Sequence, residues 1–113
     1  MTSSREPSAR VQYVREVLRL YTATPGVLGR VRRADRILAG QLFDRGVPIY
    51  AVEEAFVLAA ARRILHNGFS APMPPVRSLH YFQGVIQEVL ERPPGYREIS
   101  LLREKLAAHH SRY

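Results

Sequence analysis

The stretch from residue 48 to residue 66 constrains the fold more than any other part of the chain. If it is helical, apolar side chains surround almost the whole helix, and they are Ile49, Val52, Ala55, Phe56, Val57, Leu58, Ala59, Ala60, Ala61, Ile64 and Leu65. A helix without a polar face is either buried or in contact with a partner. We therefore expect helix 48–66 at the centre of a helical bundle.

Four more helices are predicted around it, each with a narrower apolar stripe. No stretch of useful length alternates as a strand would, and 113 residues suit a single domain. The predicted fold is therefore all-α, a compact bundle of about five helices around a central apolar helix. The four outer helices are expected at about residues 8–22, 30–45, 77–92 and 96–110.

The helical domain is expected to cover residues 8–108. Residues 1–7 are expected to be a disordered lead, and residues 109–113 a frayed tail. Ser8 and Ser78 are candidate helix caps, because a hydroxyl oxygen there accepts a hydrogen bond from a free backbone N–H. A proline-rich loop, 67–75, separates the central helix from the next one.

Specific apolar stripes follow from helical spacing in the first two helices. The first stripe comprises Val11, Val14, Leu18 and Tyr21, and the second comprises Val31, Ala34, Leu38 and Leu42. Asp35 lies beside the second stripe, where an unpaired carboxylate is costly. We therefore expect Asp35 to pair with an arginine, and the candidates are Arg45, Arg62 and Arg63.

The positive charge of the chain is concentrated just where helix 30–45 begins. The formal net charge is +7, and Lys105 is the only lysine, so arginine carries nearly all of it. The guanidinium fork suits bidentate contacts with phosphate. We therefore predict a surface that binds the backbone of DNA or RNA, with DNA favoured, formed by Arg30, Arg32, Arg33, Arg36, Arg97, Arg103 and Lys105. The alternative is that this basic run is simply a solvated helix face.

Enzymatic classes find no support in the sequence. The chain has no cysteine, no paired histidines at zinc-motif spacing and no glycine-rich phosphate loop. We therefore expect a protein that is not an enzyme and has no cofactor or metal. No apolar run suits a membrane span or a signal peptide, which indicates a cytoplasmic protein. The high arginine and alanine content is typical of a GC-rich bacterial genome.

Helices 30–45 and 48–66 have roughly the spacing of a DNA-reading helix-turn-helix, with Gly46 in the turn. The candidate recognition helix begins with apolar and acidic residues, including Glu53 and Glu54. These first residues, 48–54, offer no arginine, asparagine or glutamine to base edges. The sequence therefore favours contacts with the phosphate backbone, which position a protein without specifying a base sequence.

One segment resembles a known family. The family is that of DnaD-type replication initiation proteins, whose C-terminal helical domain carries a Tyr-aliphatic-x-x-Ile-Leu-x-x-Trp helix. The matching residues here are Tyr81-Phe82-Gln83-Gly84-Val85-Ile86-Gln87-Glu88-Val89. Val89 stands where that family has tryptophan. The resemblance covers about residues 35–92, and it implies a helical module that binds DNA non-specifically in replication or in a mobile element.

A protein–protein adaptor is the competing function. In that case helix 48–66 or loop 67–75 would dock on a protein partner, and the basic face would meet an acidic surface. The position of the arginines separates the two functions. One continuous basic face favours nucleic acid, whereas scattered arginines paired with acidic residues favour an adaptor or a plain domain.

Overall fold

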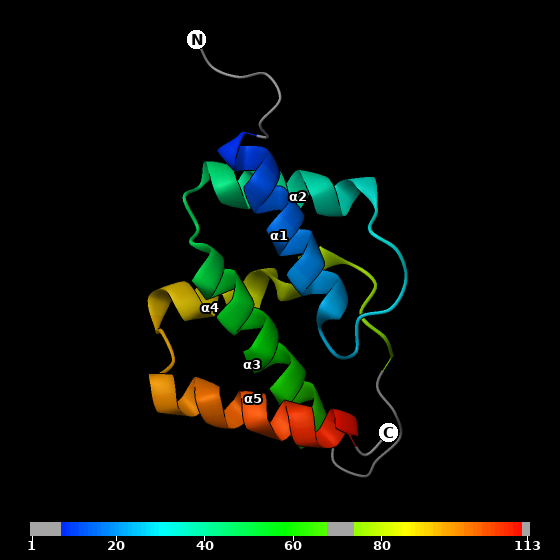
Figure 1. Ribbon diagram of the computed structural model, residues 1–113, viewed down its shortest axis with the longest axis vertical. Helices are drawn as coiled ribbons and strands as arrows, with labels where there is room; N and C mark the ends of the chain where they lie inside the picture. Colours follow the sequence, from blue (N-terminus) through cyan, green and yellow to red (C-terminus); the bar gives the residue numbers. More distant parts are fainter. Residues whose placement is uncertain (1–7, 68–73, 112–113) are drawn as a thin grey trace.

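The computed structural model describes residues 8–67 and 74–111, and in these ranges it is a helical bundle without strands (Figure 1). The all-α prediction is therefore confirmed. The elements are α1 (Ala9–Ala23), α2 (Arg33–Asp44), α3 (Ile49–Asn67), the 3-10 turn η1 (Leu79–Phe82), α4 (Gln83–Glu91) and α5 (Tyr96–Ser111). No helix in the described ranges is long and apolar enough to cross a membrane.

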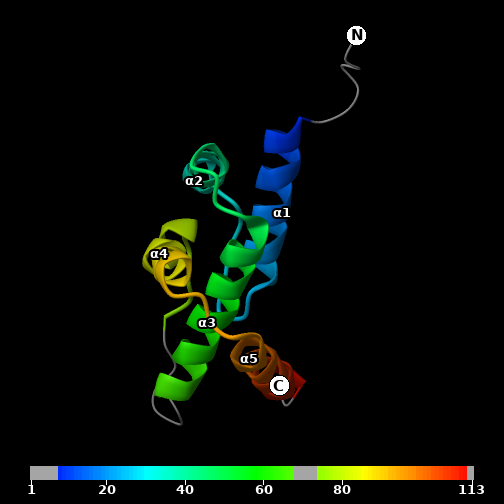
Figure 2. The same ribbon diagram turned by 90° about the vertical axis from the view of Figure 1, so that its left-hand side faces the viewer.

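Helix α3 lies at the centre, as its apolar pattern predicts. Figure 2 shows α4 on one side of it and α1 and α5 on the other, and α3 contacts all three. Three aromatic rings meet at the core, where Phe56 lies 4.7 Å from Phe82 and 6.4 Å from Tyr21 between ring centroids. Burying such rings together contributes both apolar area and favourable edge-to-face geometry.

Helix α1 begins at its predicted cap, because the Ser8 hydroxyl accepts a hydrogen bond from the Val11 N–H at 3.2 Å. Its buried face differs slightly from the predicted stripe. Val17 is fully buried and Val11 is 43% exposed.

Helix α2 begins at Arg33, three residues later than predicted. Gly29 adopts a positive φ of 99° and Arg32 is extended, so the backbone before Arg33 is not helical. Two members of the predicted stripe are consequently less buried than expected. Val31 precedes the helix and is half-buried, and Ala34 is exposed. Leu38 and Leu42 are buried as expected.

The predicted helix 77–92 is divided into η1 and α4. Ser78 acts as the predicted cap, since its hydroxyl accepts from the His80 N–H at 3.2 Å. Leu90 of α4 is 38% exposed. Helix α5 presents Ile99 inward, and its backbone stays helical to Ser111, beyond the boundary expected at residue 108. Residues 1–7, 112 and 113 of the predicted lead and tail lie outside the described ranges, as do residues 68–73 of loop 67–75.

Candidate functional site

The four arginines of the basic run lie at the entrance to α2. Arg30 and Arg32 belong to the non-helical backbone before it, and Arg33 and Arg36 lie in its first turn. All four side chains are exposed. Within residues 8–67 and 74–111, no acidic side chain forms an ion pair with any of the four guanidinium groups. These four arginines, residues 30, 32, 33 and 36, are called the arginine cluster below.

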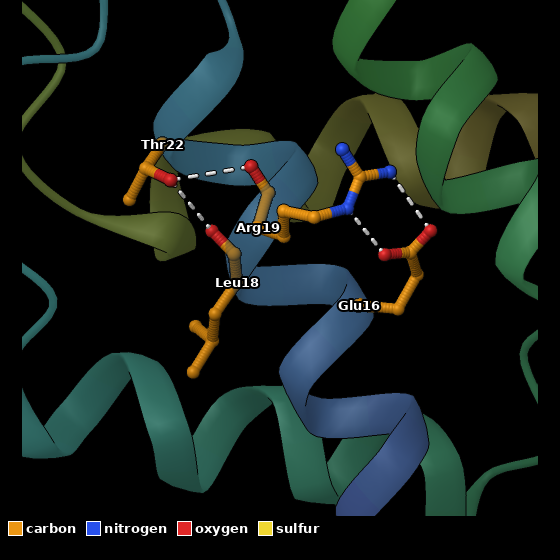
Figure 3. A network of polar contacts seen from close by, with 4 residues as sticks. All are labelled: Glu16, Leu18, Arg19 and Thr22. Carbon is orange, nitrogen blue, oxygen red and sulfur yellow. Dashed lines mark hydrogen bonds and ion pairs between the residues drawn. The ribbon is translucent and has the colours of Figure 1, made fainter.

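Four other arginines are paired with carboxylates, whereas Arg15, Arg92 and Arg97 are exposed and have no ion pair within the described ranges. Figure 3 shows one such pair, in which Arg19 contacts both carboxylate oxygens of Glu16, at 2.6 and 2.9 Å. In the same view the Thr22 hydroxyl donates to backbone carbonyls of α1, so this part of α1 is satisfied internally. The other ion pairs in the described ranges are Arg10–Asp44, Arg62–Glu88 and Arg103–Glu53.

These pairs change the electrostatics of their carboxyl groups. Hydrogen bonding to Arg19 lowers the pKa of Glu16, and hydrogen bonding to Arg10 lowers the pKa of Asp44. The pKa of Glu88 is lowered by Arg62 in the same way. Each of these carboxylates therefore stays ionised and cancels the charge of its arginine. The arginine cluster retains a positive charge that no paired carboxylate cancels.

Asp35 is the acidic residue within the basic run, but its carboxylate turns inward and is only 1% exposed. One oxygen accepts from the backbone N–H of Arg32 and the other from that of Leu79, both at 2.9 Å. The expected arginine partner for Asp35 was therefore wrong. Backbone N–H groups, with the positive end of the α2 dipole, stabilise a buried carboxylate without a counter-ion.

The three arginines proposed as partners of Asp35 are occupied elsewhere. Arg62 pairs with Glu88, and Arg45 donates to the Gln87 side chain at 3.4 Å. Arg63 donates to the Pro74 carbonyl at 2.6 Å and lies 5.6 Å from the centre of the Tyr81 ring. All three therefore join α2 or α3 to the segment around α4 and leave Asp35 to the backbone.

A second cationic segment approaches the arginine cluster from a distant part of the chain. The Val76 N–H donates to the Gly26 carbonyl at 2.8 Å, and the Leu28 N–H donates to the Val76 carbonyl at 2.9 Å. Arg77 follows directly, is exposed, and has no ion pair within the described ranges. Sequence reasoning missed Arg77, because it is an isolated arginine and only backbone contacts between distant loops bring it to this region.

The remaining predicted site residues lie elsewhere. Arg97, Arg103 and Lys105 belong to α5, which lies at the opposite end of the bundle from α2 in both views (Figures 1 and 2). Arg103 is also 3.5 Å from Glu53 and therefore partly neutralised. The structure brings Arg30, Arg32, Arg33 and Arg36 together, and it does not join them to the α5 residues in one continuous face.

An open cleft of about 150 Å³ lies where the C-terminal end of α1, the middle of α3 and α5 meet. Its lining is largely apolar, with the Glu53–Arg103 pair as its charged component. The charged part of this lining is one carboxylate paired with one guanidinium group, so the residues of the cleft include no pair of carboxylates for acid–base chemistry. Within the described side chains, no group of three His, Asp or Glu residues could hold a metal ion.

Comparison of this chain with protein-family models, with curated proteins and with solved structures found no match.

Proposed function

We propose that the protein is a non-enzymatic nucleic-acid-binding accessory protein, and that the arginine cluster contacts the phosphate backbone. One observation carries the proposal. The arginine cluster is exposed and has no carboxylate partner, whereas Arg10, Arg19, Arg62 and Arg103 are paired with acidic residues. A localised positive charge of this kind, made of forked donors, suits an array of phosphates.

The arrangement favours backbone contacts over base reading. Helix α3 would be the recognition helix of a helix-turn-helix, but its apolar positions Val52, Ala55 and Phe56 are buried in the core. Binding by the arginine cluster would therefore vary little with base sequence. A role beside bacterial replication or in a mobile element, with DNA as the ligand in the cytoplasm, is the part of the proposal that the DnaD-type resemblance suggests.

The adaptor function is less well supported by the same structure. An adaptor that docks through α3 needs exposed apolar positions along that helix. Most of them are used by the intramolecular core, and the large hydrophobic side chains of α3 that are exposed lie near its two ends, at Tyr50 and Leu65. We therefore place nucleic-acid binding ahead of adaptor function.

The test is a titration with fluorescent duplex and single-stranded DNA at several salt concentrations. Phosphate binding releases counterions, so log K should fall linearly with log salt, by about 0.9 per phosphate neutralised on duplex DNA. The double variant Arg32→Ala/Arg33→Ala should reduce this slope by about 1–2 and weaken all sequences alike.

A matched control keeps the change in net charge constant. The double variant Arg97→Ala/Lys105→Ala also removes two positive charges, but from α5 at the other end of the bundle. It should leave the slope within about 0.5 of the wild-type value, because screening over a Debye length of about 10 Å weakens distant charges. Equal losses in the two double variants would show that net charge alone drives binding. Absence of binding at low salt would overturn the proposal and favour an adaptor.

A further inference from the structure

We infer that the phosphate-binding surface is composite, with Arg77 as a fifth cationic member and Asp35 as the residue that positions the two segments. This inference rests on the proposed function, because it describes the same site and the same ligand, the nucleic-acid backbone. Arg77 lies 41 positions beyond Arg36 in the sequence and is exposed. It reaches the arginine cluster only through the tertiary fold.

Two sets of backbone contacts hold Arg77 in place. On one side, Val76 exchanges hydrogen bonds with Gly26 and Leu28, in the loop that leads to the arginine cluster. On the other side, the Leu79 N–H donates to Asp35. Arg77 stands between these two attachments, so its backbone has little freedom to move away from the arginine cluster.

Asp35 joins the two segments through a single carboxylate. Its two oxygens accept from Arg32, within the arginine cluster, and from Leu79, two residues after Arg77. Both bonds are charge-assisted and lie at a site that is 1% exposed, which makes them stronger than ordinary surface contacts. The two hydrogen bonds hold the segments of Arg32 and Arg77 at a fixed spacing. Because the carboxylate is buried, it does this without pairing with a guanidinium group.

Arrangement matters for the ligand because phosphates occur at regular spacing along a nucleic-acid backbone. Five arginines whose backbone is held by the fold lose less conformational freedom on binding than the same arginines on a flexible chain. A loop in which Arg77 moved independently of Arg32 would contribute to net charge but not to a defined set of contacts.

The first experiment removes the new member. Arg77→Ala should reduce the salt slope for a duplex of about 20 base pairs by about 0.9, one phosphate contact. Arg92→Ala is the matched control, because it removes one exposed arginine from the far end of α4 and should leave the slope unchanged. If Arg32→Ala/Arg33→Ala reduces the slope and Arg77→Ala does not, the composite surface is wrong while the proposed function stands.

The second experiment tests Asp35 as a positioning residue. Asp35→Asn should weaken the hold on Leu79, so hydrogen exchange at the Leu79 and Arg32 amides should become faster. In the Asp35→Asn background, Arg77→Ala should change the slope by less than half of its effect in the wild type. Leu42→Ala is the control, because it destabilises α2 without touching either amide, and in its background the effect of Arg77→Ala should be intact.

The outcomes are distinguishable. An undiminished effect of Arg77→Ala in the Asp35→Asn background would refute positioning by Asp35. Equal attenuation in the Asp35→Asn and Leu42→Ala backgrounds would attribute it to general loss of stability and would also refute positioning. Wild-type protein that binds neither duplex nor single-stranded DNA at low salt would remove both the composite surface and the function on which it rests. The Arg77→Ala measurement uses the wild-type scaffold, so it remains decisive even if Asp35→Asn folds poorly.

Discussion

Replacing Asp35 with alanine should be one of the most damaging single changes in α2. The substitution removes both acceptors and leaves the Arg32 and Leu79 N–H groups without a partner. Leu79 is fully buried, so its amide should incur the full penalty of an unsatisfied donor, about 1–3 kcal/mol. Arg32 is exposed, so water replaces part of its lost bond, and the missing cap at the start of α2 costs about 1 kcal/mol.

Together these effects predict that the free energy of unfolding falls by about 2–4 kcal/mol, against a typical total of about 5–15 kcal/mol. Urea denaturation followed by circular dichroism measures the change, provided that the m-value is unaltered. Asp44→Ala is the matched control, because it removes the same charge from the same helix. Its carboxylate is exposed and paired with Arg10, so its removal should cost clearly less stability than the removal of Asp35.

A loss below about 1 kcal/mol for Asp35→Ala would refute the reasoning. It would mean that the Leu79 N–H finds another acceptor or water, and that the carboxylate does not bind the two segments together. Equal losses for Asp35→Ala and Asp44→Ala would point to net charge as the cause, since the two variants share it.

Three other changes test separate parts of the structure. Phe56→Ala should cost about 3–5 kcal/mol in urea denaturation, because the ring is 2% exposed and packs on two other aromatic rings, and a loss under about 1 kcal/mol would place α3 at an interface instead. Gly40→Ala should raise the free energy of unfolding by about 0–1 kcal/mol, because alanine favours a helix by about 1 kcal/mol over glycine and the atoms nearest to the new Cβ belong to the flexible Arg10 guanidinium. A loss of stability above about 1 kcal/mol would contradict this. Burial raises the pKa of Tyr13 to about 12, and the neutral hydroxyl donates a hydrogen bond to the Val47 carbonyl at 2.7 Å. The stability gained from this neutral hydroxyl should therefore be present below pH 10 and be lost as the pH rises toward 12. The difference in ultraviolet titration between wild type and Tyr13→Phe measures that pKa, and a value near 10 would show that the hydroxyl is solvated.

The fold could be predicted because its main determinants are local. The apolar pattern of helix 48–66 predicts a central position for that helix. The hydroxyls of Ser8 and Ser78 cap helix starts by accepting a hydrogen bond from an N–H no more than three residues away. The start of α2 was misplaced because Gly29, with its positive φ, continues the loop where apolar spacing alone suggested helix.

The site was less predictable because it depends on contacts between distant residues. Burial of a carboxylate beside the α2 stripe was inferred from its position, but its partners are two amides, one of them 44 residues away. Helical spacing carries no information about such a partner. The same limit explains why Arg77 was overlooked and why α2 and α5, both basic in sequence, face different ends of the bundle.

The bond between Asp35 and Leu79 also has a consequence for folding kinetics. Helices α1, α2 and α3 follow one another closely in the chain, and they need only short loops to meet. The Asp35–Leu79 contact must instead close a loop of more than forty residues. The entropic cost of closing this loop is larger than the cost of closing the short loops between α1, α2 and α3. The arrangement of the cationic surface is therefore expected to be among the last features to form.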